Sequence, residues 1–176
     1  MEPIIVYLIR RTMMMPSIAS RLESELNRFL QQVLDRNAAA LRTSYSIAVQ
    51  RVSSTPTSAR SLDVVIYLVA DAAHSISDGF EGVDSHPSGH GGRTYQLPGN
   101  TTGSEIYVGT ENGTMLAKVA FHEMLHYKTG WDNATLHSHS SGGITAASLQ
   151  VDTAINDGNL ELMGQHLGAQ RTPYLL

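Results

Sequence analysis

The sequence predicts an α+β fold: a mixed, twisted sheet of four to five strands packed on a backing helix and on a second helix that carries polar residues. Two apolar runs rich in β-branched residues, 4–9 and 62–69, are typical of strands covered on both faces. Apolar residues recur at spacings of three and four along 18–34, which indicates an amphipathic backing helix. The second helix is expected to end at Gly130, because glycine is a favoured C-terminal cap.

The other expected elements follow in order along the chain. Ser17, which comes directly after Pro16, is the expected N-cap of the backing helix. A segment rich in Gly, Ser and His, 71–103, contains one short edge strand, and its histidines are interpreted as solvated loop residues. The remaining predictions are strands at 45–50, 93–97 and 105–109, the polar helix from 113 or 114, and a last helix at 157–167 in a small C-terminal helical subdomain.

Composition restricts the kind of site that the chain can build. The chain has 176 residues, no cysteine and a formal net charge of −4. Without cysteine it can form neither a disulfide nor a thiolate metal site, so His, Asp or Glu must hold any metal. The negative charge argues against a nucleic-acid partner, because phosphate binding requires a basic surface.

No targeting segment is expected. The apolar run at 3–9 is too short for the core of a signal peptide, and Arg10 and Arg11 follow the run instead of preceding it. Nothing approaches the length of a transmembrane helix, so no membrane partner is predicted. We therefore expect a soluble protein that is cytoplasmic or exported by a non-classical route.

The segment from His122 to His126 carries the chemistry. Residues four apart lie one above the other on a helix, so the imidazoles of His122 and His126 can bind a single ion. Glu123 lies too far around the helix to join them as a ligand. It can instead act as general base toward a water that the metal activates, and then pass the proton to a leaving amine.

This His-Glu-x-x-His helix resembles the signature of the zincin metallopeptidases, and the order of elements is similar to the upper subdomain of the metzincin branch. The resemblance is close over the motif, loose over the elements before Gly130 and weaker after it. It implies a zincin-like fold in one domain, 1–176, with an upper subdomain at 1–130 and a lower subdomain at 131–176. It also implies one Zn²⁺ per chain and a peptide or protein substrate held along the edge strand.

A catalytic zinc requires a third protein ligand, and several residues compete for this role. Metzincin spacing selects Asp132, although Thr129 stands where that family has glycine. The Leu-His step at His137, followed by Gly142-Gly143, resembles a stretch of small bacterial zincin-like domains, and imidazole suits zinc well. We therefore favour His137 and keep His139, Asp132, Asp152 and Glu161 as alternatives. If it is not a ligand, Asp132 either orients a ligand imidazole or caps a turn next to Asn133.

These observations predict a zinc metallopeptidase of the small bacterial metzincin-like type. His122, His126 and His137 are the expected ligands, and Glu123 is the expected general base. Two other functions fit the same residues. One is a non-catalytic zinc-binding module whose site is closed by four protein ligands, and the other is a secreted effector or toxin on a zincin scaffold.

Overall fold

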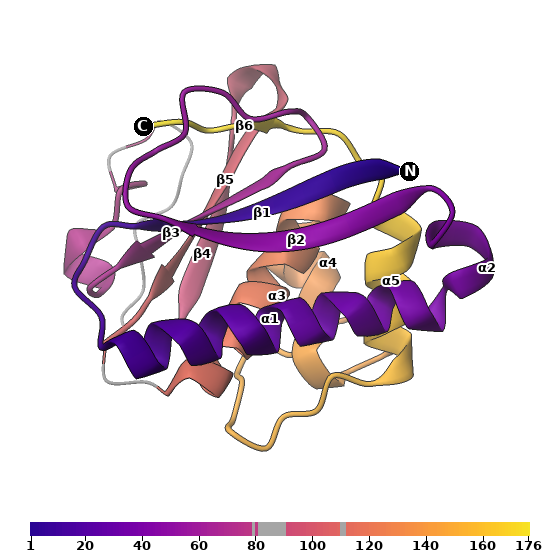
Figure 1. Ribbon diagram of the computed structural model, residues 1–176. Coiled ribbons are helices and arrows are strands. Elements are labelled where there is room, and N and C mark those ends of the chain that lie inside the picture. Colours follow the sequence, from indigo (N-terminus) through magenta and orange to yellow (C-terminus); the bar gives the residue numbers. More distant parts are fainter. Residues whose placement is uncertain (79, 81–90, 110–111) are drawn as a thin grey trace.

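The computed structural model describes residues 1–78, 80, 91–109 and 112–176. It shows a mixed α/β fold with a mostly parallel sheet in the order β2-β1-β3-β5-β4 (Figure 1). Only β4 runs antiparallel to its described neighbour, β5. The strands are β1 (Glu2–Arg10), β2 (Tyr45–Val52), β3 (Val64–Val69), β4 (Gly92–Leu97), β5 (Thr101–Tyr107) and the short β6 (Thr172–Pro173), which pairs with β5.

Three long helices contact one another and lie below the sheet in Figure 1. They are α1 (Pro16–Arg36), α3 (Gly113–Thr129) and α5 (Asp157–His166). Two short helices, α2 (Ala38–Leu41) and α4 (Asn133–His137), complete the set among the described residues. No helix in these described ranges is long and apolar enough to cross a membrane.

The central strand β3 is buried at all six of its positions, as its continuous apolar sequence predicts. The connection from β2 to β3 and the C-terminal segment lie above the sheet in Figure 1. The Tyr67 hydroxyl binds that C-terminal segment through two hydrogen bonds: it donates to the carbonyl of Tyr174 at 2.8 Å and accepts from the backbone N–H of Leu176 at 2.9 Å. Both faces of the sheet are therefore covered at its centre.

The two main helices bury different amounts of their surface. Helix α1 buries one apolar row and exposes the opposite face, as its spacing predicts. Helix α3 is buried on nearly all sides, polar residues included. Because α1, α5 and the sheet all contact α3, it is the central helix of the fold.

Some sequence predictions of local structure are wrong in detail. Ser17 does not cap α1: the helix begins at Pro16, its N-cap is Met15, and no side chain caps it. Proline suits this first position because its missing N–H would have no helical partner there. The strand expected at 105–109 begins at Thr101 and ends at Tyr107, because a tight turn at 98–100 joins it to β4. The short elements α2, α4 and β6 were not predicted.

Asp63 fixes the start of β3 against β1. It is 1% exposed, and its Oδ1 accepts hydrogen bonds from the backbone N–H of Ile5 at 2.9 Å and from the Arg60 guanidinium at 2.8 Å. Its Oδ2 accepts from the backbone N–H of Arg60 at 2.9 Å. Burial acts to raise the pKa of Asp63, but the Arg60 and Ile5 donors outweigh it and hold the pKa below its usual value.

We expect Asp63→Asn to lower the free energy of unfolding by about 2 kcal/mol at neutral pH, because Arg60 loses its charged acceptor. The stabilisation from a carboxylate with a lowered folded pKa is complete above its unfolded value and disappears as the pH falls through the folded value. Urea unfolding of both proteins should therefore give curves that converge in acid. The exposed Asp152→Asn is the control, and equal stability of Asp63→Asn and wild type at pH 7 would refute this role.

Candidate metal centre

Helix α3 is fixed at both ends by local contacts. At its start, the side chain of Asn112 accepts a hydrogen bond from the backbone N–H of Met115 at 2.8 Å. At its end, Gly130 adopts the left-handed conformation with φ 70° and donates its N–H to the carbonyl of His126 at 2.9 Å. The predicted glycine cap is therefore confirmed. A regular helix between these caps puts His122 and His126 one turn apart on the same face.

Three imidazoles converge beside this helix. His122 and His126 come from α3 and are buried, whereas His137 ends α4 and is partly exposed. One ligand atom from each ring lies within 4.8 Å of the other two, and the Nε2 atoms of His122 and His137 are 3.3 Å apart. This group of three histidines could hold a metal ion.

Two backbone carbonyls orient the helical imidazoles. Nδ1 of His122 donates to the carbonyl of Ile144 at 2.7 Å, and Nδ1 of His126 donates to the carbonyl of Trp131 at 2.8 Å. A proton on Nδ1 leaves the lone pair on Nε2, so both rings present this atom as the ligand. Burial also lowers the pKa of His126, which favours the neutral form that binds metal.

Asn159 on α5 supports the carbonyl that orients His122. Its Oδ1 accepts from the backbone N–H of Ile144 at 3.2 Å, and its Nδ2 donates to the carbonyl of Gly142 at 2.9 Å. Sequence reasoning missed Asn159. The only signal was the Gly142-Gly143 pair, which marked a tight turn without showing what packs on it.

Glu123 is 5% exposed and lies against strand β4. Its Oε2 accepts a hydrogen bond from the Thr94 hydroxyl at 2.7 Å. Burial raises the pKa of Glu123 to about 8; the Thr94 hydrogen bond lowers it, and the nearby Glu105 carboxylate raises it. A divalent cation beside this carboxylate would lower its pKa again, because the cation favours the ionised form.

The structure places the other candidate ligands elsewhere. Asp132 caps α4, where its Oδ1 accepts from the backbone N–H of Thr135 at 2.8 Å. His139 shares a hydrogen bond with Ser141, and Glu161 pairs with Arg36 at the surface. Of the histidines outside the centre, His74 pairs with Asp71 on the surface, whereas His86 and His90 lie outside the described residues. Asp152 is exposed, and none of the described alternatives belongs to the group of three histidines.

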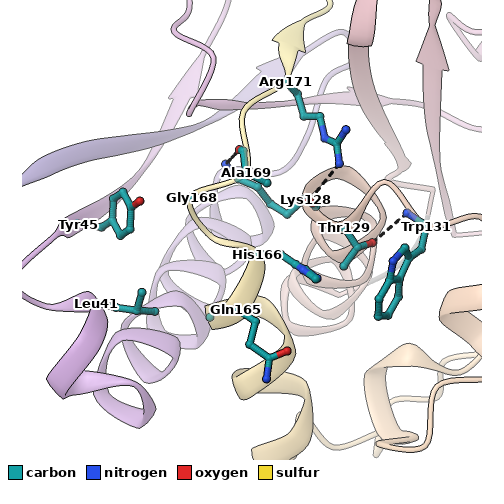
Figure 2. A pocket seen from close by; sticks show the side chains of 11 residues that line it. Leu41, Tyr45, Lys128, Thr129, Trp131, Gln165, His166, Gly168, Ala169 and Arg171 are labelled. Carbon is teal, nitrogen blue, oxygen red and sulfur yellow. Dashed lines mark hydrogen bonds between the residues drawn. The ribbon is translucent and has the colours of Figure 1, made fainter.

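A cavity of about 450 Å³ lies at the C-terminal end of α3 (Figure 2). Its lining includes neither Glu123 nor the three clustered histidines, so the metal centre lies outside it. The cationic side chains of this lining bind backbone carbonyls. Lys128 Nζ donates to the carbonyl of Leu62 at 2.8 Å and to the carbonyl of Ala169 at 3.0 Å. The Arg171 guanidinium donates to the backbone carbonyl of Lys128 at 3.4 Å. These cations therefore join α3 to the C-terminal segment.

His166 on α5 lines the same cavity. It is half-buried and meets the Trp131 ring edge-on, with 5.4 Å between ring centroids. Within the described residues neither ring nitrogen has a hydrogen-bond partner, and burial lowers the pKa of His166. The ring therefore packs as a neutral side chain at the end of α5.

Comparison of the chain with protein-family models, with curated proteins and with solved structures gives no match. The site must therefore be interpreted from its own geometry.

With Zn²⁺ as the probe metal, we expect His137→Ala to weaken binding by more than about 100-fold, because it would remove one of three candidate ligands and not merely a supporting contact. Competition with a chromogenic chelator measures this affinity. His139→Ala should bind as the wild type does. Asp132→Asn keeps a capping side chain and removes the carboxylate, so it should also bind normally. If Asp132→Asn loses zinc and His137→Ala does not, the choice of His137 is wrong.

Proposed function

We propose that this protein is a zinc-dependent metallopeptidase that resembles the zincins. One observation carries the proposal: three imidazoles with ligand atoms within 4.8 Å of one another converge at a helix that also bears the buried carboxylate of Glu123. Three imidazoles can hold a cation and leave a coordination position for a water or a substrate. A carboxylate beside that position can accept and release a proton.

The distance between His122 and His137 fits zinc. Two nitrogens that are each about 2.0–2.1 Å from a tetrahedral zinc lie about 3.3–3.4 Å apart. The Nε2 atoms of His122 and His137 are 3.3 Å apart. Because the Nδ1 proton of His122 is donated to a carbonyl, its Nε2 lone pair faces His137, as ligation of a shared cation requires. Imidazole is also a ligand that zinc accepts readily when cysteine is lacking.

The residues around the centre can divide the work of peptide hydrolysis. Zinc in such a site supplies Lewis acidity toward the attacking water and the substrate carbonyl. Glu123 accepts the proton of the water at Oε1, because Oε2 is already engaged by Thr94. Glu123 then delivers the proton to the leaving amine, so the proton crosses from nucleophile to leaving group on one carboxylate.

Strand β4 supports a peptide as the substrate. It ends the strand order of the described sheet, and its Thr94 contacts Glu123 directly. An extended chain that adds to such an edge by backbone hydrogen bonds would lie beside the proton acceptor. This arrangement favours a peptide or protein substrate over a compact small molecule.

We expect Glu123→Gln to lower the rate of peptide hydrolysis by about 10²–10⁴-fold while one zinc per chain is retained, because general-base catalysis is lost and the ligands are untouched. A mixed library of fluorogenic peptides measures the rate, and elemental analysis measures the zinc.

The control for this variant is Glu161→Gln, which makes the same change at a surface carboxylate paired with Arg36. It should keep the wild-type rate. A Glu123→Gln protein that hydrolyses the library as fast as the wild type would rule out Glu123 as the base.

A further inference from the structure

Thr94 on β4 contacts both the side chain and the backbone of Glu123. Its Oγ1 lies 2.7 Å from Glu123 Oε2 and 3.0 Å from the Glu123 carbonyl oxygen. The same Oγ1 lies 2.7 Å from the Oγ of Ser104, the residue directly opposite Thr94 in the β4–β5 pair. The β4–β5 pair therefore brings two hydroxyl groups in series to the carboxylate, Thr94 from β4 and Ser104 from β5.

Each hydroxyl has one proton to donate, and this determines which group donates and which accepts along the series. A hydroxyl donates one proton and can accept others. When Glu123 is ionised, as it would be beside a divalent cation, Thr94 gives its proton to Oε2, its nearest charged acceptor. Ser104 is fully buried, and among the described residues its hydroxyl has Thr94 as its partner, so Ser104 donates to Thr94. Hydrogen bonds that run in one direction polarise and strengthen one another.

Gly92 lets the carboxylate lie this close to the strand. It is two residues before Thr94 and therefore faces the same side of β4. A Cβ atom at Gly92 would lie 2.8 Å from the backbone carbonyl oxygen of Glu105, 2.9 Å from Glu123 Cγ and 3.0 Å from Glu123 Oε1. Two positions of β4 thus accommodate the Glu123 side chain, one through a hydroxyl and one through the absence of a side chain, which the neighbouring β5 backbone also requires.

We propose that Thr94 is a positioning residue for Glu123, with Ser104 as the donor behind it. Thr94 holds Oε2 against β4 and so leaves Oε1 as the atom that exchanges protons at the metal centre. This inference rests on the proposed function, in which Glu123 is the general base.

A purely structural role for Thr94 makes a different prediction. If the hydroxyl only provides a hydrogen bond to a buried carboxylate, its loss lowers the stability of the protein and leaves ligand binding at the zinc unchanged. If the hydroxyl positions Glu123, its loss lowers the affinity for any zinc-bound ligand that shares a proton with Glu123. This holds even in a protein that is fully folded and loaded with zinc. Acetohydroxamate is such a ligand, because it chelates zinc and gives its hydroxyl proton to a neighbouring carboxylate.

The experiment measures binding of acetohydroxamate to zinc-loaded wild type, Thr94→Val, Thr94→Ser and Ser104→Ala by calorimetry. We expect Thr94→Val to weaken binding by about 10–100-fold at unchanged zinc affinity, as loss of a supporting contact does in other metal sites. Thr94→Ser restores the hydroxyl and should restore binding. The affinity of Ser104→Ala for acetohydroxamate should lie between those of wild type and Thr94→Val. This variant decides the question if Thr94→Val does not fold.

The matched control is Thr102→Val, which changes a buried threonine of β5 whose hydroxyl has no hydrogen-bond partner in the described part of the chain. It should bind acetohydroxamate as the wild type does. Wild-type binding by Thr94→Val, or by Ser104→Ala where Thr94→Val is unfolded, overturns the positioning role. If the zinc-loaded wild type itself does not bind acetohydroxamate, the zinc has no open position, and the proposed function fails with this inference.

Discussion

Helix α3 is buried along nearly its whole length, although its second half carries several ionisable side chains. An unpaired buried polar group costs about 1–3 kcal/mol, so each of these side chains must find a partner inside the protein. Apart from the Trp131 carbonyl, which lies just after the end of α3, the partners come from parts of the chain far from α3 in sequence. They are the Thr94 hydroxyl for Glu123, the Ile144 and Trp131 carbonyls for His122 and His126, and the Leu62 and Ala169 carbonyls for Lys128.

Lys128 is a buried side chain of α3 that also needs hydrogen-bond partners, although it does not belong to the group of three histidines. It is 1% exposed, and burial lowers its pKa to about 8, while Asp63 raises the pKa and Arg171 lowers it. Its two carbonyl partners belong to the chain before β3 and to the segment after α5. The last turn of α3 therefore joins two distant segments close to His126, which ties this end of the helix to the rest of the fold. Lys128 and Arg171, the cations that line the nearby cavity, therefore stabilise the fold through their bonds to backbone carbonyls.

Local features of this protein could be predicted from the sequence, and features that depend on distant contacts could not. The helix of the motif and its end at Gly130 follow from spacing and from one glycine, so both were predicted. The grouping of His137 with the motif is the exception: it was expected from a sequence resemblance, although the helix α4 that carries it is too short to show a periodic pattern. The roles of Thr94 and Asn159 depend on how β4 and α5 dock on α3, and neither residue stands in a recognisable motif. Ser17 was assigned as a cap from a residue preference that the proline before it overrides.

Asn159 illustrates how the candidate site keeps a single geometry although it is assembled from distant segments. Its Oδ1 accepts from the backbone N–H groups of Asn156 and Ile144, and its Nδ2 donates to Ser141 Oγ and to the carbonyl of Gly142. All four hydrogen-bonding positions of the amide are therefore used. Reversing the amide would place its NH₂ group against two backbone N–H donors and its oxygen against the Gly142 carbonyl oxygen, so this orientation is strongly preferred. That orientation fixes the Ile144 carbonyl, and the carbonyl in turn fixes which nitrogen of His122 faces the other two histidines.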